Sequence, residues 1–287
     1  MRRRRRLLLC ALLAGLVVVA GLAVRWVAAP SDERADLSTR PGTSARPGPF
    51  VPGPGMGSAP GVGPASNATA AHGSEAGIRY TFDGGLGEPV TDAAGRLGLR
   101  ARRAGGGQLS AVAHDGGLAV RFPPRCEHYG AESCARAIVQ SGPAGFLNPG
   151  RGSITYGATV LVQPNETSKG ANVVQKGFSV GDSQFKLQVD GEAGQPSCVI
   201  VGTGSSAIFV AVAARSIADG RWHRIACSRG NSLLTVVVDG AEAGRTAVPP
   251  SLSIANDDPL CIGGKGTSAN NDQFVGAIDD VFVTRIA

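Results

Sequence analysis

Residues 219–240 read DGRWHRIACSRGNSLLTVVVDG, in which two apolar runs are followed by a turn pair. The second run, residues 233–238, has the length of a strand and is rich in β-branched side chains. Asp239-Gly240 is a pair that commonly connects two antiparallel strands through a tight turn. The stretch therefore predicts a hairpin whose second strand covers residues 241–248.

Similar runs of strand length lie on both sides of this hairpin, and Gly, Asp and Asn separate them. Several of them alternate between apolar and polar side chains, whereas long helical periodicity is nearly absent. We therefore predict an all-β fold made of a two-sheet antiparallel sandwich. The other expected strands are residues 154–163, 184–189, 198–201, 208–213, 224–227 and 273–283.

The N-terminal residues have the pattern of a membrane-targeting segment. An unbroken arginine block at residues 2–6 precedes 18 uncharged residues, 7–24, which would span about 27 Å as a helix. Arginines in front of such a segment hold the N-terminus in the cytoplasm and send the following chain outward. Two outcomes stay open, a retained signal anchor or a signal peptide cleaved near residue 29. The protein is thus expected in the cell membrane, with a single span and its domain outside, or secreted.

Residues 30–77 are expected to form a disordered linker, because they hold 8 Pro and 9 Gly and bury too little apolar area to fold. The formal net charge of +6 is concentrated before the predicted sandwich. Residues 1–77 hold 9 Lys or Arg and 4 Asp or Glu, a net +5, which leaves +1 for residues 78–287. This distribution argues against nucleic acid as a partner.

Five cysteines follow the apolar segment, an odd number for an oxidising compartment. Sequence alone does not fix their pairing. Cys126 and Cys134 are close enough to clip one loop, and Cys198 and Cys227 lie in successive apolar runs that could be neighbouring strands. We predict these two disulfides and expect Cys261 to remain as a buried small hydrophobic residue. Metal binding by cysteines is not expected, since no C-x-x-C pair occurs.

Two motifs with catalytic or cofactor-binding counterparts are better interpreted as turns. Residues 177–181 fit G-x-S-x-G, but the segment that follows alternates like a strand and not like the helix of a nucleophile elbow. Residues 202–207 resemble a dinucleotide-binding loop, yet β-branched residues follow there as well. No E-x-D-x-E triplet, the closely spaced carboxylates of a sandwich glycosidase, occurs in the chain.

Four motifs occur in a fixed order in the C-terminal part of the chain. They are D-G-x-W-H at residues 219–223, a strand that ends in Asp239-Gly240, I-G-G at residues 262–264 and F-V-G-A-I-D-D-V at residues 274–281. In this order they resemble the laminin G-like (concanavalin A-like lectin/glucanase) jelly-roll family. The resemblance covers residues 78–287 and implies a jelly roll there, with Trp222 expected to fill the gap between the sheets.

Members of this family mostly bind sugars or extracellular proteins, and some hold calcium at the rim of the sandwich. By resemblance, Asp83 and Asp279 match acidic positions of the first and last strands, which makes them the candidate calcium ligands. The carboxylate triplet of the glucanase branch is missing. We therefore expect a non-catalytic extracytoplasmic module that binds carbohydrate or another cell-envelope or matrix component. The alternatives are a polysaccharide hydrolase with an unrecognised acid pair and a structural envelope protein without a soluble ligand.

Overall fold

The computed structural model describes residues 75–287 except for residues 88, 129–130, 181 and 287. The predicted apolar segment at residues 7–24 and nearly all of the predicted linker lie outside the described residues. Within the part of the chain that the structure describes, no helix is long and apolar enough to cross a membrane.

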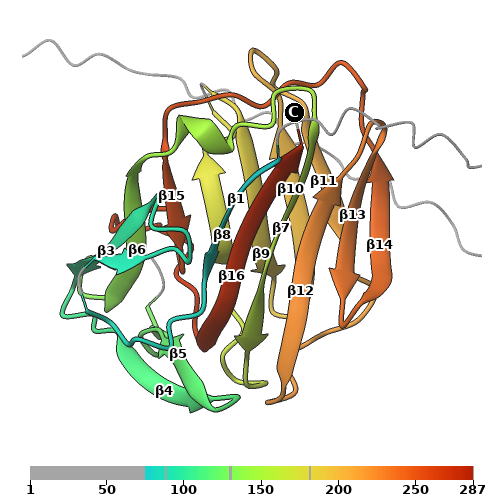
Figure 1. The fold of residues 1–287 in the computed structure, drawn as a ribbon. Coiled ribbons are helices and arrows are strands. Elements are labelled where there is room, and N and C mark those ends of the chain that lie inside the picture. The colour runs from blue at the N-terminus through green and yellow to red at the C-terminus, as the bar shows by residue number, and fades with distance from the viewer. Residues whose placement is uncertain (1–74, 88, 129–130, 181, 287) are drawn as a thin grey trace, which may run out of the picture. The chain divides into compact units, whose positions relative to one another are not determined.

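Two eight-stranded antiparallel sheets face one another, so the predicted all-β sandwich is confirmed (Figure 1). In sheet A the order is β14-β13-β12-β7-β16-β5-β4, and β1 also pairs with β16. In sheet B the order is β11-β10-β9-β8-β15-β6-β3-β2. A short 3-10 helix, η1 (Gly145–Leu147), follows β6. The strands of sheet A are β1 (Glu75–Tyr80), β4 (Ser110–His114), β5 (Gly117–Arg121), β7 (Ser153–Leu161), β12 (Trp222–Arg229), β13 (Leu233–Val238), β14 (Ala241–Ala247) and β16 (Ala277–Ile286). Those of sheet B are β2 (Val90–Thr91), β3 (Gly98–Ala104), β6 (Arg136–Pro143), β8 (Ala171–Gly177), β9 (Gln184–Asp190), β10 (Gln195–Val201), β11 (Ile208–Val212) and β15 (Pro259–Ile262).

The hairpin predicted around Asp239-Gly240 is present as β13 and β14. Asp239 and Gly240 have φ angles of 52° and 81°, the positive values that a type I′ turn requires at both central residues. Gly177 of the G-x-S-x-G motif ends β8, and residues 178–180 follow it in the connection to antiparallel β9. Residues 202–207 connect antiparallel β10 and β11. Both motifs are therefore turns between strands, as expected.

The core lies between the sheets, where Tyr156 of β7 packs on Phe185 of β9 with ring centroids 4.9 Å apart. Trp222 does not contribute to this layer, so the prediction that it fills the gap is wrong. The alternation that turns Ile225 and Cys227 into the core turns Trp222 to the outer face of sheet A. There it is half-buried and stacks on His114, with ring centroids 3.8 Å apart.

The first strand begins slightly before the expected boundary at residue 78, because pairing between β1 and β16 extends to Glu75 and Ile286. This pairing places the start of β1 beside the C-terminal end of β16. The β5–β6, β7–β8, β9–β10 and β15–β16 connections lie at the opposite end, where β16 begins (Figure 1). β1 therefore begins at the end away from these four connections.

Candidate functional site

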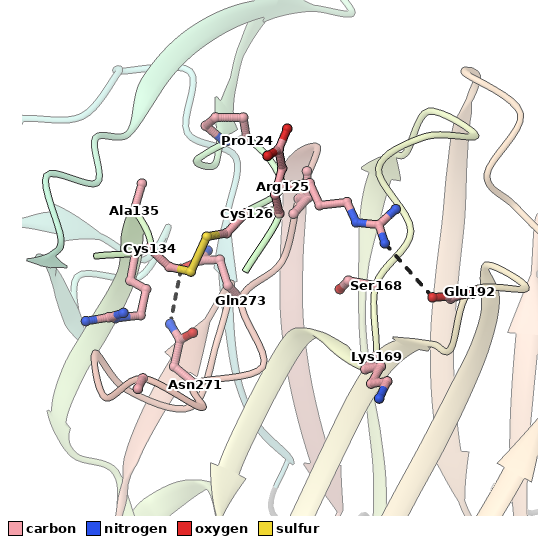
Figure 2. A pocket seen from close by; sticks show the side chains of 14 residues that line it. Pro124, Arg125, Cys126, Cys134, Ala135, Ser168, Lys169, Glu192, Asn271 and Gln273 are labelled. Carbon is pink, nitrogen blue, oxygen red and sulfur yellow. Dashed lines mark hydrogen bonds and ion pairs between the residues drawn. A yellow bond between two sulfur atoms is a disulfide. The ribbon is translucent and has the colours of Figure 1, made fainter. Parts of the chain in front are cut away.

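The four connections at this end enclose a cleft of about 200 Å³. Figure 2 shows the Cys126–Cys134 disulfide on one side of the cleft, with Ser168 and Lys169 on the other. These four residues come from two connections that are separated in the sequence by β6 and β7, so folding brings the two walls together. We refer to this cleft between the β5–β6 and β7–β8 connections as the loop-end cleft.

A disulfide and a buried arginine hold the first wall. The Cys126–Cys134 disulfide closes the β5–β6 connection. The guanidinium of Arg136 lies behind it, where Nε donates to the carbonyl of Thr267 at 3.0 Å and Nη1 to the carbonyl of Ala131 at 2.9 Å. Because Arg136 is only 2% exposed, its guanidinium stabilises the first wall and does not face solvent.

Gln273 joins the same wall to the sheet. Its amide nitrogen donates to the carbonyl of Ala137 at 2.9 Å, and its amide oxygen accepts from the backbone N–H of Ala137 at 2.9 Å. The oxygen also accepts from Asn271 Nδ2, so both ends of the Gln273 amide are occupied. The β15–β16 connection is thus fixed to the start of β6, and the first wall is preorganised.

The second wall presents polar groups that the fold does not use. The hydroxyl of Ser168 is buried and has no hydrogen-bond partner in the described structure, and Figure 2 shows it turned toward the disulfide side of the cleft. Lys169 is exposed and has no ion-pair partner among the described residues. Arg125 and Glu192 face one another at 4.0 Å, with side chains 49% and 74% exposed (Figure 2).

The chemistry of this arrangement suits binding. The described lining residues hold hydroxyl, amide, ammonium, guanidinium and carboxylate groups but no histidine that could act as a base beside Ser168. Pro124, Ala135, Ala269 and Val275 add apolar surface. A small cleft with an apolar surface and a few polar groups is typical of a ligand site.

The predicted calcium ligands lie elsewhere in the sandwich, and both contact the β4–β5 hairpin. Asp83 Oδ1 accepts a hydrogen bond from the backbone N–H of Leu118 at 3.3 Å. Asp279 Oδ2 lies 2.5 Å from Nδ1 of His114. Burial raises the pKa of the Asp279 carboxyl, and the hydrogen bond with His114 offsets part of this rise. In the described part of the chain, no group of three or more His, Cys, Asp or Glu side chains is arranged to hold a metal ion.

Asp279 and Asp280 have different partners, since the pairing of β16 with β7 shifts register after Asp279 and Asp280 has a φ of 49°. Asp280 turns to solvent and forms an ion pair with Arg79 at 2.6 Å. Asp279 is 4% exposed and remains with His114.

The structure contains the Cys126–Cys134 and Cys198–Cys227 disulfides, and Cys261 is a buried free thiol. Cys198 lies in β10 of sheet B and Cys227 in β12 of sheet A, so this bond crosses the core and does not join neighbouring strands of one sheet. Burial raises the pKa of the Cys261 thiol to about 11, which keeps it protonated at neutral pH.

Sequence reasoning missed Arg125, Ser168, Lys169 and Glu192, since no motif or spacing relates residues of three separate loops. The one available signal was the short spacing of Cys126 and Cys134, which marked the β5–β6 connection as a constrained loop. The lone feature that distinguishes Ser168, an unsatisfied buried hydroxyl, exists only in the folded chain.

Comparison with known proteins agrees with this architecture. A family model for the concanavalin A-like lectin/glucanases superfamily matches residues 141–287. Domain 4 of AbnA, a GH43 extracellular arabinanase from Geobacillus stearothermophilus solved in complex with arabinotriose, has 17% identity and a TM-score of 0.54 over 73% of this chain and 92% of that one. The binding domain of Paraclostridial Mosquitocidal Protein 1 has 13% identity and a TM-score of 0.53 over 73% of this chain and 48% of its own. No curated protein sequence matches the chain significantly. At these identities, the structural similarity establishes the fold alone.

Proposed function

We propose, since the chain belongs to the concanavalin A-like lectin/glucanases superfamily, that its sandwich is a non-catalytic carbohydrate-binding module displayed outside the cytoplasm. The observation that carries this proposal is the loop-end cleft, in which a rigid wall faces the unused polar groups of Ser168 and Lys169. A preorganised site loses little conformational entropy when its ligand binds.

Similar structures with carbohydrate ligands support the proposal. The arabinanase domain was solved with an arabinose oligosaccharide bound, and it is matched over nearly its whole length. A solved structure of botulinum neurotoxin type C, whose cell entry depends on two ganglioside molecules, has 6% identity and a TM-score of 0.50 over 72% of this chain and 46% of that one. A shared sandwich does not define a ligand, so the loop-end cleft and not the fold names the site to be tested.

The non-catalytic role is supported by the missing carboxylate triplet and by the composition of the cleft. Glu127 and Glu192 are the two carboxylates that line it. A hydrolase would need one of them as acid and the other as base or nucleophile. Release of reducing sugar that disappears in Glu127→Gln or Glu192→Gln would favour the hydrolase over the binding module.

Display outside the cytoplasm is supported by the arginine block and the uncharged segment at residues 7–24. The two disulfides are also typical of proteins in oxidising compartments. Protease added to intact cells should therefore remove the sandwich, and protection that lasts until the membrane is lysed would contradict this topology.

The direct test is a glycan array probed with the full-length protein, followed by an assay for turnover of each bound glycan. We expect binding without turnover, and we expect a Ser168→Ala/Lys169→Ala variant to lose it. Arg245→Ala is a matched control, because Arg245 is an exposed arginine on β14 away from the cleft. Absence of any glycan binding would instead favour a structural envelope protein.

Calcium remains a prediction that rests on the family resemblance. Asp83 and Asp279 already interact with Leu118 and His114, and two carboxylates supply only part of the six to eight oxygens that calcium takes. If calcium binds at these residues, chelation should lower the melting temperature of the wild type and added calcium should restore it. If the wild type and Asp279→Ala each give the same melting curve with and without chelator, the calcium prediction is wrong.

A further inference from the structure

We propose that the loop-end cleft selects a sugar residue that carries a carboxylate, such as a uronic acid, and that Lys169 and Arg125 bind this carboxylate. The inference rests on the proposed carbohydrate-binding function and adds the charge of the ligand to it.

The first step is the buried hydroxyl of Ser168. This residue is 8% exposed, lines the cleft, and has no hydrogen-bond partner in the described structure. A buried polar group without a partner destabilises the free protein, and a ligand oxygen that accepts the Ser168 proton removes that cost. The Ser168 hydroxyl is therefore an unused donor on the β7–β8 side of the cleft, and its oxygen is closed to water in the free protein.

The second step is the ammonium group of Lys169, the next residue in the chain. It is exposed at the cleft, and no acidic side chain of the described structure pairs with it. Its ion-pairing capacity is thus available to a ligand. A neutral sugar would leave this charge unpaired, whereas a carboxylate beside Ser168 would form a charge-assisted hydrogen bond with it.

The third step concerns Arg125 and Glu192. Their 4.0 Å separation exceeds hydrogen-bond distance, so the guanidinium donors of Arg125 are not held by this carboxylate. Glu192 is 74% exposed and can turn into solvent at little cost. A ligand carboxylate can therefore replace Glu192 at Arg125 and make the bidentate contact that the chain's own carboxylate does not make.

The charges that line the cleft determine which ligands can displace Glu192 from Arg125. Arg136 is already bound to loop carbonyls and to Glu132. Lys169 and Arg125 then balance Glu127 and Glu192, so the free cleft is close to neutral. A ligand carboxylate must displace Glu192 from Arg125, and this competition weakens its binding. Removal of the Glu192 charge should therefore strengthen the binding of an acidic ligand.

The experiment is a calorimetric titration of the full-length protein with an oligogalacturonate and with the matching neutral galactose oligomer, at about 150 mM salt. We expect the acidic oligomer to bind roughly tenfold more tightly, and Lys169→Ala or Arg125→Ala to remove most of that preference. Glu192→Gln should tighten binding of the acidic oligomer by about threefold and leave the neutral one unchanged. Lys169→Arg should keep the preference, and Arg245→Ala should have no effect. A melting curve for each variant separates lost binding from lost folding.

Equal affinity for both oligomers, or weaker acidic binding in Glu192→Gln, would overturn the inference while the carbohydrate-binding function stands. Binding of neither oligomer by the folded wild type, with no other glycan bound on the array, would overturn both. Equally tight binding of a glutamate-rich peptide would show that the cleft recognises carboxylates without sugar, which would also overturn it.

Discussion

His223 lies between two carboxylates and joins the β11–β12 connection to the β13–β14 turn. Its Nδ1 lies 2.7 Å from Asp239 Oδ2 and its Nε2 lies 3.1 Å from Asp219 Oδ1. Partial burial lowers the pKa of His223, but the hydrogen bonds and charges of Asp239 and Asp219 outweigh it, so the pKa lies above its ordinary value. The histidine of the D-G-x-W-H motif is therefore a structural clamp in this chain.

The raised pKa predicts how the clamp depends on pH. A histidine whose pKa is higher in the folded state stabilises the fold fully below its unfolded pKa, about 6.5, and this contribution is lost as pH rises through the folded value. We expect His223→Gln to reduce the free energy of unfolding more at about pH 5.5 than at about pH 8.5, measured with urea. Asp239→Asn should weaken this pH dependence. If His223→Gln lowered the free energy of unfolding equally at both pH values, the assignment of His223 as a clamp would be wrong.

The β13–β14 hairpin depends on a backbone conformation that glycine adopts easily. Gly240 has a φ of 81°, and no atom lies within 4 Å of where a Cβ would stand. Gly240→Ala should therefore cost about 1 kcal/mol through backbone strain alone. Gly230→Ala is the matched control, because this glycine also has open space but lacks a positive φ. Denaturant unfolding should separate the two, and equal stabilities would refute the strain argument.

The two disulfides should have separable roles. The Cys198–Cys227 bond joins the sheets across the core with 29 residues of separation, so Cys198→Ala/Cys227→Ala should lower the free energy of unfolding by about 3 kcal/mol. The glycan affinity of this variant should stay unchanged, because the Cys198–Cys227 bond lies away from the cleft. Cys126→Ala/Cys134→Ala should cost less stability, since that separation is 8 residues, but it should lose glycan binding. Unfolding and titration of both variants test this, and a reversed pattern would contradict it.

The strands differ in how far their sequences reveal them. The β13–β14 hairpin and β9 could be predicted because their turns and alternation follow from local physics. All seven residues of β8 are buried, so it shows no alternation. Its polar side chains find partners within the fold, as where Asn172 Nδ2 donates to Gln175 Oε1 at 2.5 Å, although Asn172 Oδ1 has no hydrogen-bond partner in the described structure. Residues 273–276 were expected to be strand but form part of a connection, because the Gln273 amide binds across to β6.

The loop-end cleft could not be predicted for a different reason. Its polar groups come from connections that are distant in the sequence, and they converge only through the order of strands in the two sheets. Trp222 shows the same dependence on tertiary structure. Its motif marks the fold, but the register of β12 against β7 decides which face of sheet A the side chain occupies.

At the scale of the molecule, β10 connects the end that holds the cleft with the opposite end. The β9–β10 turn at residues 191–194 carries Glu192 at the cleft, whereas the β10–β11 turn at residues 202–207 lies at the other end of the strand. The ten residues of β16 set the distance between the ends at about 30 Å, at roughly 3.3 Å per residue. β1 begins with Glu75 at the same end as the β10–β11 turn.

Because the cleft lies at one end of the sandwich, a bulky partner should block glycan binding only when it is attached at that end. A biotinylated peptide inserted at residues 191–194 and loaded with streptavidin should abolish binding, because it stands over the cleft. The same peptide at residues 202–207 should leave the affinity unchanged, because this turn lies at the far end of β10. Titration of each variant before loading shows whether the insertion itself damages the site. If streptavidin at residues 202–207 blocked the glycan and streptavidin at residues 191–194 did not, the ligand would bind at the end where β1 begins, and the loop-end cleft would not be the binding site.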